Sequence, residues 1–345
     1  MLYILPIEPL EERYSKQWLQ WTCDYVWNNN IEHIVICPDS YGEINTGAFL
    51  DVVNTNVFKN AQMQSILQLF KKGQVKDGDI FWFHDMWFPG LEMLAYIRDG
   101  LGIDFKIYGM LHAGTYDSHD FLAKKGMRKW GKFLESSWFN IVDGMFVATE
   151  FHKRLVKRGS TGLVSKRVHV TGFPMYASRF AMPQRKAHNR DKIIVFPHRL
   201  DEEKQPHLFS QLKQEMLEKY PWCRNYQFIK TKEVCKTKEE YFQLLCRAEY
   251  AVSFALQETW GIAMQEAVLC GCIPIVPARL SYREMYPYVF QYDGEAVEAA
   301  QCIDIIRSDT EVSQYVHGIL HDTCVKLKHQ GERAFGNMMR IMGVL

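Results

Sequence analysis

The chain repeats one pattern along its length, in which short apolar runs alternate with amphipathic helical stretches. In the first half, the runs expected to form strands lie at residues 2–6, 33–37, 80–84, 106–111 and 145–149. The pattern restarts after residue 190, with strands expected at 192–197, 226–229 and 250–255 and helices at about 205–220 and 238–247. Such alternation is typical of a parallel sheet wound by crossover helices. We therefore expect an α/β protein with two doubly wound, Rossmann-like domains that face a central cleft.

The length of 345 residues agrees with this division, because single hydrophobic cores stop growing at roughly 250 to 300 residues. Residues 173–190 include two prolines and end in a polar run, which is the composition of a linker. We expect a first domain at residues 1–175, a second at 176–330, and a C-terminal helix at 331–345 that packs back on the first domain.

Composition narrows the class of protein further. With 47% hydrophobic and 23% charged residues, the chain resembles ordinary soluble globular proteins. Its nine cysteines lack the paired spacing of a zinc site, so we expect reduced thiols in the cytosol. The sequence opens without a charged leader and has no apolar run long enough to cross a bilayer. A cytoplasmic protein without a signal peptide or a membrane span is therefore expected.

Residues 257–277, QETWGIAMQEAVLCGCIPIVP, carry the strongest local signal of a ligand site. Glu258 and Glu266 flank an apolar helix that Gly261 opens, and the first backbone N–H groups of such a helix favour a phosphate. Glu266 lies on the inward side, where its carboxylate accepts hydrogen bonds from sugar hydroxyls. Two glutamates at this spacing usually mark a solvated helix face. The apolar residues 262–264 between them favour a packed helix instead.

This segment resembles the Glu-x7-Glu signature of retaining glycosyltransferases with the GT-B architecture, especially the large family 4 group. The resemblance implies that Glu258 contacts hydroxyls of the donor sugar and that Glu266 holds the ribose of the nucleotide. Gly261 matches the glycine whose backbone approaches the diphosphate. The residues between, from which we also expect donor contacts, are Thr259, Trp260 and Ile262.

A second element, KIIVFPHRLDEEKQP, ends a strand and then supplies Arg199 and Lys204. It resembles the Gly-Arg-Leu…Glu-Lys-Gly element of the same family, which implies that both cations neutralise the leaving diphosphate. Taken alone, an Arg and a Lys at this spacing usually face solvent. With these cations and the helix end on the diphosphate, no divalent metal and no cofactor beyond the nucleotide sugar is required. We interpret Asp77-Gly78-Asp79, an Asp-x-Asp pattern, as a turn before a strand.

The first domain contributes histidines at strand ends. His112 follows one strand, where the resemblance implies a histidine that faces the scissile bond of the donor; the alternative is a histidine that caps the strand by bonding to backbone. His84 and Asp85 follow another strand and either contact the acceptor or are structural. The chain departs from the family after its first strand, because residues 6–10 replace a glycine-rich loop. Arg13 is a candidate substitute cation there.

Residues 124–167 concentrate positive charge, although the whole chain has a formal charge of only +1. We expect Lys124, Arg128 and Lys132 to share one face of a helix, opposite an apolar stripe of Met127, Trp130 and Leu134. A basic face usually means a solvated surface. In the acceptor-side domain it also suits a polyanion such as double-stranded DNA, or an anionic membrane that carries a lipid acceptor.

The chain looks like bacteriophage-encoded glycosyltransferases that modify hydroxymethylated bases in DNA. We therefore expect a retaining transferase that moves a sugar from a nucleoside diphosphate to an acceptor hydroxyl, with His112, Glu258, Arg199 and Lys204 at the reaction centre. One alternative is a peripheral lipid or polysaccharide glycosyltransferase. Another is an inert module that binds a nucleotide sugar or a carbohydrate.

Overall fold

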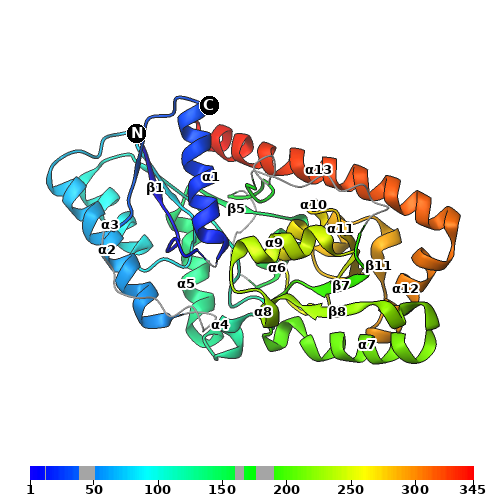
Figure 1. Cartoon of the computed structure of the whole chain (residues 1–345). Helices are drawn as coiled ribbons and strands as arrows, with labels where there is room; N and C mark the ends of the chain where they lie inside the picture. Colours follow the sequence, from blue (N-terminus) through cyan, green and yellow to red (C-terminus); the bar gives the residue numbers. More distant parts are fainter. Residues whose placement is uncertain (12, 39–50, 160–166, 176–189) are drawn as a thin grey trace. The chain divides into compact units, whose positions relative to one another are not determined.

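A computed structural model describes residues 1–11, 13–38, 51–159, 167–175 and 190–345 of the chain, and Figure 1 traces the order of their helices and strands. The chain divides into two compact units. Unit 1 comprises Met1–Ala148, His152–Pro174 and Arg333–Leu345, and unit 2 comprises Thr149–Phe151 and Met175–Glu332.

Unit 1 is built on a parallel sheet with the strand order β2-β1-β3-β4-β5-β6. The strands are β1 (Leu2–Leu5), β2 (His33–Val35), β3 (Ile80–Phe83), β4 (Lys106–Met110), β5 (Gly144–Val147) and β6 (Val168–Val170). Every residue of β1, β3 and β5 is buried, as a parallel sheet covered on both faces requires.

The helices of unit 1 connect these strands. They are α1 (Tyr14–Asn28), α2 (Val52–Lys71), α3 (Leu91–Leu101), α4 (Phe121–Lys124), α5 (Arg128–Ile141) and α6 (Glu150–Gly159), the last of which belongs to this unit from His152 onward. A buried apolar cluster of this unit includes Phe81, Phe83, Phe105 and Trp138, so the core there is rich in aromatic rings.

Residues 331–345 are not a separate helix, because α13 runs without a break over Thr310–Met342. Its final part, from Arg333 onward, is counted with unit 1. There Phe335 stacks on Tyr25 of α1 at 4.9 Å between ring centroids, and Tyr108 donates a hydrogen bond to the carbonyl of Ile341.

Unit 2 has a second parallel sheet, in the order β11-β10-β9-β7-β8. Its strands are β7 (Ile193–Phe196), β8 (Gln227–Lys230), β9 (Tyr250–Val252), β10 (Ile273–Pro277) and β11 (Gln291–Tyr292). Its helices are α7 (Pro206–Lys219), α8 (Thr231–Val234), α9 (Lys238–Arg247), α10 (Ile262–Leu269), α11 (Tyr282–Met285), α12 (Ala296–Ser308) and the larger part of α13. In this unit α7 and α12 pack side by side.

The predicted fold class is confirmed, since both units are Rossmann-like parallel sheets wound by helices. One predicted strand, at residues 250–255, is too long. The strand ends at Val252, and Ser253 begins the loop that carries the candidate site. Among the described helices, none combines the length and the apolar character that crossing a bilayer needs.

Candidate functional site

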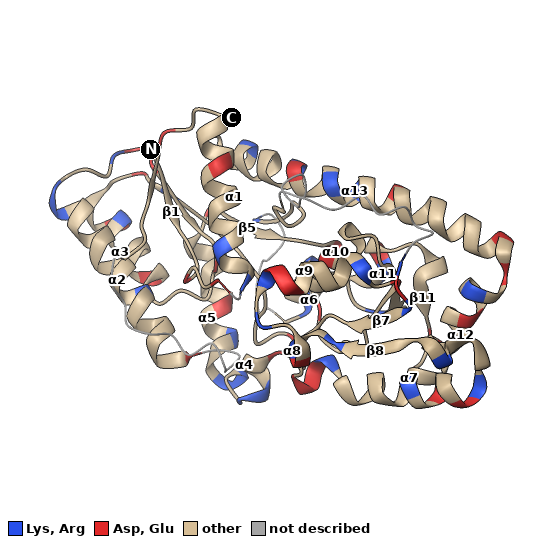
Figure 2. Cartoon of the chain, in the orientation of Figure 1, with Lys and Arg blue, Asp and Glu red and all other residues tan. Residues whose placement is uncertain are grey.

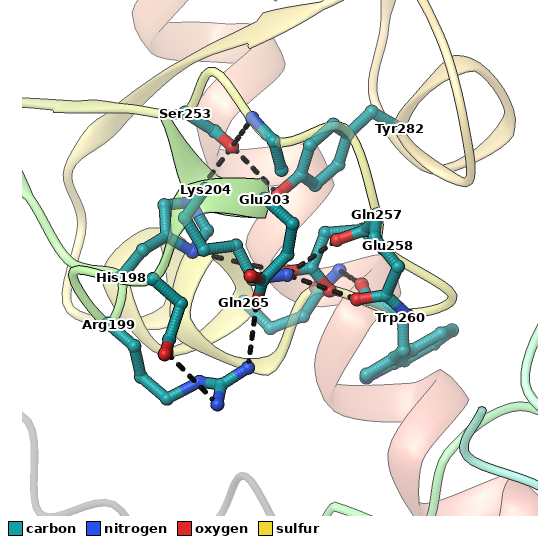
Figure 3. Close-up of polar contacts among 12 residues, drawn as sticks. His198, Arg199, Glu203, Lys204, Ser253, Gln257, Glu258, Trp260, Gln265 and Tyr282 are labelled. Atoms are coloured by element: carbon teal, nitrogen blue, oxygen red, sulfur yellow. Dashed lines mark hydrogen bonds and ion pairs between the residues drawn. The ribbon is translucent and has the colours of Figure 1, made fainter. Parts of the chain in front are cut away.

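The loop after β7 brings Lys204 into the interior of unit 2. Lys204 ends a single 3-10 turn, Glu202–Lys204, and only 5% of the residue is exposed. Its ammonium group donates to the backbone carbonyl of Gln257, to the side-chain oxygen of Gln257 at 3.3 Å and to Oε1 of Glu258 at 2.9 Å (Figure 3). All three ammonium hydrogens of Lys204 are thus directed at one loop, and the lysine fixes that loop against the end of β7.

Glu258 lies in the loop between β9 and α10, where the sequence predicts it. Its carboxylate is 14% exposed and forms an ion pair with Lys204. Burial raises the pKa of this carboxyl, but the charge and the hydrogen bond of Lys204 outweigh burial and hold the pKa below its ordinary value of 4.5. Glu258 is therefore ionised at neutral pH and accepts hydrogen bonds, as contact with sugar hydroxyls requires.

His198 is a buried neighbour that the sequence did not reveal. Its Nδ1 lies 3.7 Å from the Glu258 carboxylate, and its Nε2 lies 2.8 Å from Oγ of Ser253. Ser253 in turn lies 2.9 Å from the hydroxyl of Tyr282 (Figure 3). Burial lowers the pKa of His198 to about 3. The ring is therefore neutral at pH 7, and it supports Glu258 through orientation rather than through charge.

Arg199 is also paired with carboxylates. It lies 3.1 Å from the carboxylate of Asp201 and 3.1 Å from that of Glu203. The sequence predicts Arg199 and Lys204 as cations for a diphosphate, and this role stays a prediction. The structure adds that both cations are already neutralised by the chain. A phosphate at this position must compete with Asp201, Glu203 and Glu258 for them.

Gly261 precedes α10 in the left-handed region, with φ +75°. A Cβ at this position would lie 2.8 Å from Cε1 of Tyr282, so glycine is required by both the backbone and the space. Among the described residues, no acceptor is hydrogen-bonded to the backbone N–H groups of Ile262 and Ala263, and no side chain caps the helix. The start of α10 therefore offers the donors that an anion needs.

Glu266 is buried in α10 and is held by a partner from another helix. Lys238, the first residue of α9, donates to Oε1 of Glu266 at 2.7 Å. The same ammonium group lies over the rings of Tyr241 at 4.8 Å and Phe242 at 5.0 Å. Burial and the nearby Glu266 raise the pKa of Tyr241 well above its ordinary value, so this phenol stays neutral. Both glutamates of the Glu-x7-Glu segment are thus fixed by a lysine.

In unit 1, His112 follows β4 and bonds to backbone, as the structural alternative predicts. Its Nε2 lies 2.6 Å from the carbonyl of His84, and its Nδ1 lies 3.3 Å from the hydroxyl of Tyr14. His84 is fully buried, stacks on Trp18 at 4.1 Å, and has a pKa lowered to about 3 by burial and by His112. Burial also lowers the pKa of His112. Both rings are neutral, and a catalytic role for His112 stays a prediction.

Asp85 is also held by hydrogen bonds within unit 1. Its Oδ2 accepts from Lys59 at 2.8 Å, and its Oδ1 accepts from the backbone N–H of Trp87 at 3.1 Å. The loop after β1 holds a buried carboxylate, Glu8, which accepts from the hydroxyl of Thr55 at 2.7 Å.

Arg13 lies 3.6 Å from the carboxylate of Glu8. Arg13 therefore forms an ion pair with the loop after β1, which contains no glycine. Its predicted use as a substitute cation for a phosphate stays a prediction.

The predicted basic helical face is wrong in its geometry. α4 ends at Lys124 and α5 begins at Arg128, with Gly126 between them at φ +76°, so Lys124, Arg128 and Lys132 do not lie on one helix. The predicted apolar stripe is also wrong, because Trp130 is 53% exposed. The face of α5 that faces the core instead carries Gly131, Glu135, Trp138 and Phe139.

The fold of the whole chain matches known structures. HepE of Anabaena, solved with UDP and glucose, superposes with a TM-score of 0.64 and 10% identity over 98% of this chain and 99% of that chain. The sucrose-phosphate synthase of Thermosynechococcus elongatus gives a TM-score of 0.68 and 10% identity over 98% of both chains. These neighbours are GT-B proteins. The chain has the GT-B fold.

One curated relative extends the likeness to sequence. The chain is 30% identical to the tRNA-queuosine alpha-mannosyltransferase of Drosophila melanogaster over 154 residues, which cover 36% of this chain and 40% of that protein. The match therefore spans less than half the length of this curated relative. No family model matches the sequence.

Proposed function

We propose that this chain is a retaining glycosyltransferase that moves a sugar from a nucleoside diphosphate to a hydroxyl on a base of a nucleic acid. The observation that carries the proposal is the arrangement around α10. Glu258 and Glu266 lie on either side of a helix start whose first N–H groups have no acceptor among the residues that the structure describes, and each carboxylate is held by a lysine. A pyrophosphate fits the helix start, a ribose fits Glu266, and the donor sugar fits Glu258.

The proposed reaction uses these groups without a metal. The acceptor oxygen attacks the anomeric carbon on the face that the leaving group occupies, the bond from that carbon to the β-phosphate oxygen breaks, and this phosphate takes the acceptor proton. Arg199 and Lys204 stabilise the charge that develops on the diphosphate. For this they must exchange part of their contact with Asp201 and Glu258 for phosphate. Glu258 is thereby freed to accept from the sugar.

A nucleic-acid acceptor is supported by two independent observations. One is the positive charge that the sequence concentrates in residues 124–167, most of which belong to unit 1. The other is the likeness to a tRNA-queuosine alpha-mannosyltransferase. Within this class, a modified tRNA nucleoside and a hydroxymethylated base of bacteriophage DNA are the two acceptors to compare. Complexes of structural neighbours with UDP and UDP-glucose favour a uridine diphosphate donor.

The test is a panel of radiolabelled nucleotide sugars with tRNA, hydroxymethylated DNA, plain DNA and lipid vesicles. Transfer to tRNA or to modified DNA supports the proposal, whereas transfer only to vesicles contradicts the acceptor class. Binding of the donor with neither transfer nor slow hydrolysis identifies an inert module. The anomeric configuration of the product, read by NMR, decides between retention and inversion.

Variants connect the reaction to the site. Glu258→Ala should lower turnover by about a hundredfold or more, the loss expected for one missing polar stabiliser of the transition state. Glu218→Ala, which removes an exposed carboxylate from α7, is the matched control and should leave turnover unchanged. Equal turnover of the two variants contradicts the assignment of Glu258.

A further inference from the structure

Exposed aromatic rings and cations lie together on one surface of unit 1, around the break between α4 and α5. Trp130 is 53% exposed and Phe133 is 60% exposed, and residues three apart on a helix are neighbours on its surface. Figure 2 shows lysine and arginine gathered around α4 and the start of α5. We call this surface the α4–α5 platform, and its members are Lys125, Arg128, Lys129, Trp130, Lys132 and Phe133.

Aromatic rings connect the platform to the core of unit 1. The ring of Trp130 meets Trp87 edge to face at 6.0 Å, and Trp87 meets the buried Trp138 at 5.5 Å. Gly131 packs closely at this point, since a Cβ there would lie 2.5 Å from Cγ2 of Thr115. The exposed Trp130 is thus the outermost ring of a series that begins in the core. It presents a large surface at a small cost in conformational entropy.

The platform is also positive. In the described part of the chain, no carboxylate lies within ion-pair distance of Lys125, Lys129 or Lys132. The one carboxylate on α5, Glu135, is buried and accepts from the backbone N–H and the hydroxyl of Thr115, both at 2.6 Å. Exposed rings and lysines without a carboxylate partner therefore occur together in this segment, and Lys132 lies 4.8 Å above the ring of Phe133.

We propose that the α4–α5 platform binds unpaired bases of a nucleic acid, with Trp130 and Phe133 stacking on bases and the lysines contacting phosphates. This inference rests on the proposed function and names how the acceptor is held. Aromatic stacking combined with a basic surface is how proteins bind single-stranded segments, since every base has a stacking face. A fully paired duplex hides those faces and leaves only the phosphates to bind.

The arrangement of the side chains distinguishes this partner from a membrane surface. A helix that lies in a lipid interface carries its apolar residues on one side and its cations on the other. On α5, Lys129 and Phe133 are four residues apart and share a face. A ring inserted into lipid at Phe133 would bring Lys129 and Lys132 with it, whereas a stacked base keeps its phosphate beside them.

The experiment measures fluorescence anisotropy of a labelled RNA stem-loop and of the same stem closed as a blunt duplex, each titrated with the whole protein. Trp130→Ala and Phe133→Ala should each weaken stem-loop binding by about tenfold and leave duplex binding unchanged. Trp130→Phe, which keeps a ring, should restore most of the affinity. Trp27→Ala is the matched control, since Trp27 is 77% exposed on α1 in the same unit.

The salt dependence of binding tests the cations separately. The pair Lys125→Ala and Lys129→Ala should lower the slope of log affinity against log salt by roughly 1.4, since each phosphate contact on a single strand contributes about 0.7. The control pair is Lys71→Ala and Lys72→Ala, two exposed lysines at the end of α2, and it should leave the slope unchanged. A DNA stem-loop of the same sequence tells whether the sugar of the acceptor matters.

Three results would overturn the inference. They are equal losses for Trp130→Ala and Trp27→Ala, a duplex bound as tightly as the stem-loop, and affinity for anionic vesicles that falls in parallel when Trp130 is replaced. Hydrolysis of the donor in water is measured alongside and should be unchanged in the platform variants. If the wild-type protein transfers no sugar, the proposed function fails, yet the stem-loop comparison still decides whether the platform binds unpaired bases.

Discussion

The ion pair between Lys204 and Glu258 gives a quantitative test of the site before any substrate is known. Lys204→Met keeps most of the length of the side chain and removes its charge. The Glu258 carboxylate, which is 14% exposed, is then left without its cation. Breaking a buried pair in this way commonly costs about 3–5 kcal/mol. The glutamate can limit the loss by taking up a proton.

The largest loss of stability at a given pH is set by the free energy needed to protonate Glu258, whose ordinary pKa is 4.5. Protonation at pH 7 costs about 3.4 kcal/mol, because each pH unit is worth about 1.36 kcal/mol. At pH 5.5 the same route costs about 1.4 kcal/mol. We therefore expect Lys204→Met to lose about 3 kcal/mol of unfolding free energy at pH 7 and less than half of that at pH 5.5. Adding Glu258→Gln should recover most of the loss at pH 7.

The assay is urea unfolding followed by far-UV circular dichroism at both pH values, for the wild type, the single variant and the double variant. Arg247→Met serves as the control, because it breaks an exposed pair with Asp191 and should cost about 1 kcal/mol or less. A double variant no more stable than Lys204→Met at pH 7, or an equal loss at both pH values, would show that the unpaired Glu258 charge is not the cause of the loss.

Three further predictions concern neighbouring parts of the site. Lys238→Ala should raise the KM for the donor by about tenfold with little change in kcat, because a ground-state contact that positions Glu266 is lost. Steady-state kinetics check this, with Lys238→Arg, which keeps the charge, as the comparison. An unchanged KM would exclude Lys238 as a positioning residue. Gly261→Ala should lower the unfolding free energy by about 1–2 kcal/mol and weaken nucleotide binding, whereas Gly318→Ala, with open space around it, should not; equal thermal melts of the two variants would contradict this. Burial lowers the pKa of His198 from 6.5 to about 3. As the pH falls, this histidine therefore takes up a proton in the unfolded chain before it does so in the folded chain. The stability that neutral His198 contributes is complete above pH 6.5 and is lost below it. Between pH 7 and 5 the loss of unfolding free energy is about 2 kcal/mol. The urea concentration at the unfolding midpoint should therefore fall less over that range for His198→Gln than for the wild type. An equal fall for the two proteins would refute this.

Local patterns were sufficient to predict most of the secondary structure. α9 spans Lys238–Arg247, as predicted, and the structure explains why: Thr237 and Glu240 form a capping box that fixes its start. The strands are predicted because buried parallel strands are continuous apolar runs. Their ends are less certain, as the early end of β9 at Val252 illustrates, because the apolar residues that follow it are buried in a loop.

The candidate site was predicted only in part, because its geometry depends on contacts between distant residues. The helix start at Gly261 and the glutamates of the Glu-x7-Glu segment follow from local spacing. The partners Lys204 and Lys238 lie 54 and 28 residues away from the glutamates they hold. Nothing in a local stretch of sequence indicates that a lysine is paired, so the sequence predicts neither the contact of Lys238 with Glu266 nor the neutralised state of Lys204.

The error in the basic segment has a different cause. The prediction needs one continuous helix across residues 124–132, but Gly126 lies inside this range and takes a left-handed conformation. Glycine in a helical pattern is a signal of a possible break, and here it separates α4 from α5. The shift turns Trp130 toward solvent and places the buried Glu135 on the side of α5 that faces the core.

If the proposed function is right, the start of α10 together with Glu258 and Glu266 binds a nucleoside diphosphate. The most direct measurement is a crystal structure of the protein soaked with UDP or ADP. We expect a pyrophosphate within hydrogen-bond distance of the N–H groups of Ile262 and Ala263, with the ribose hydroxyls on Glu266. A diphosphate bound in unit 2 away from α10, or bound only in unit 1, would contradict it.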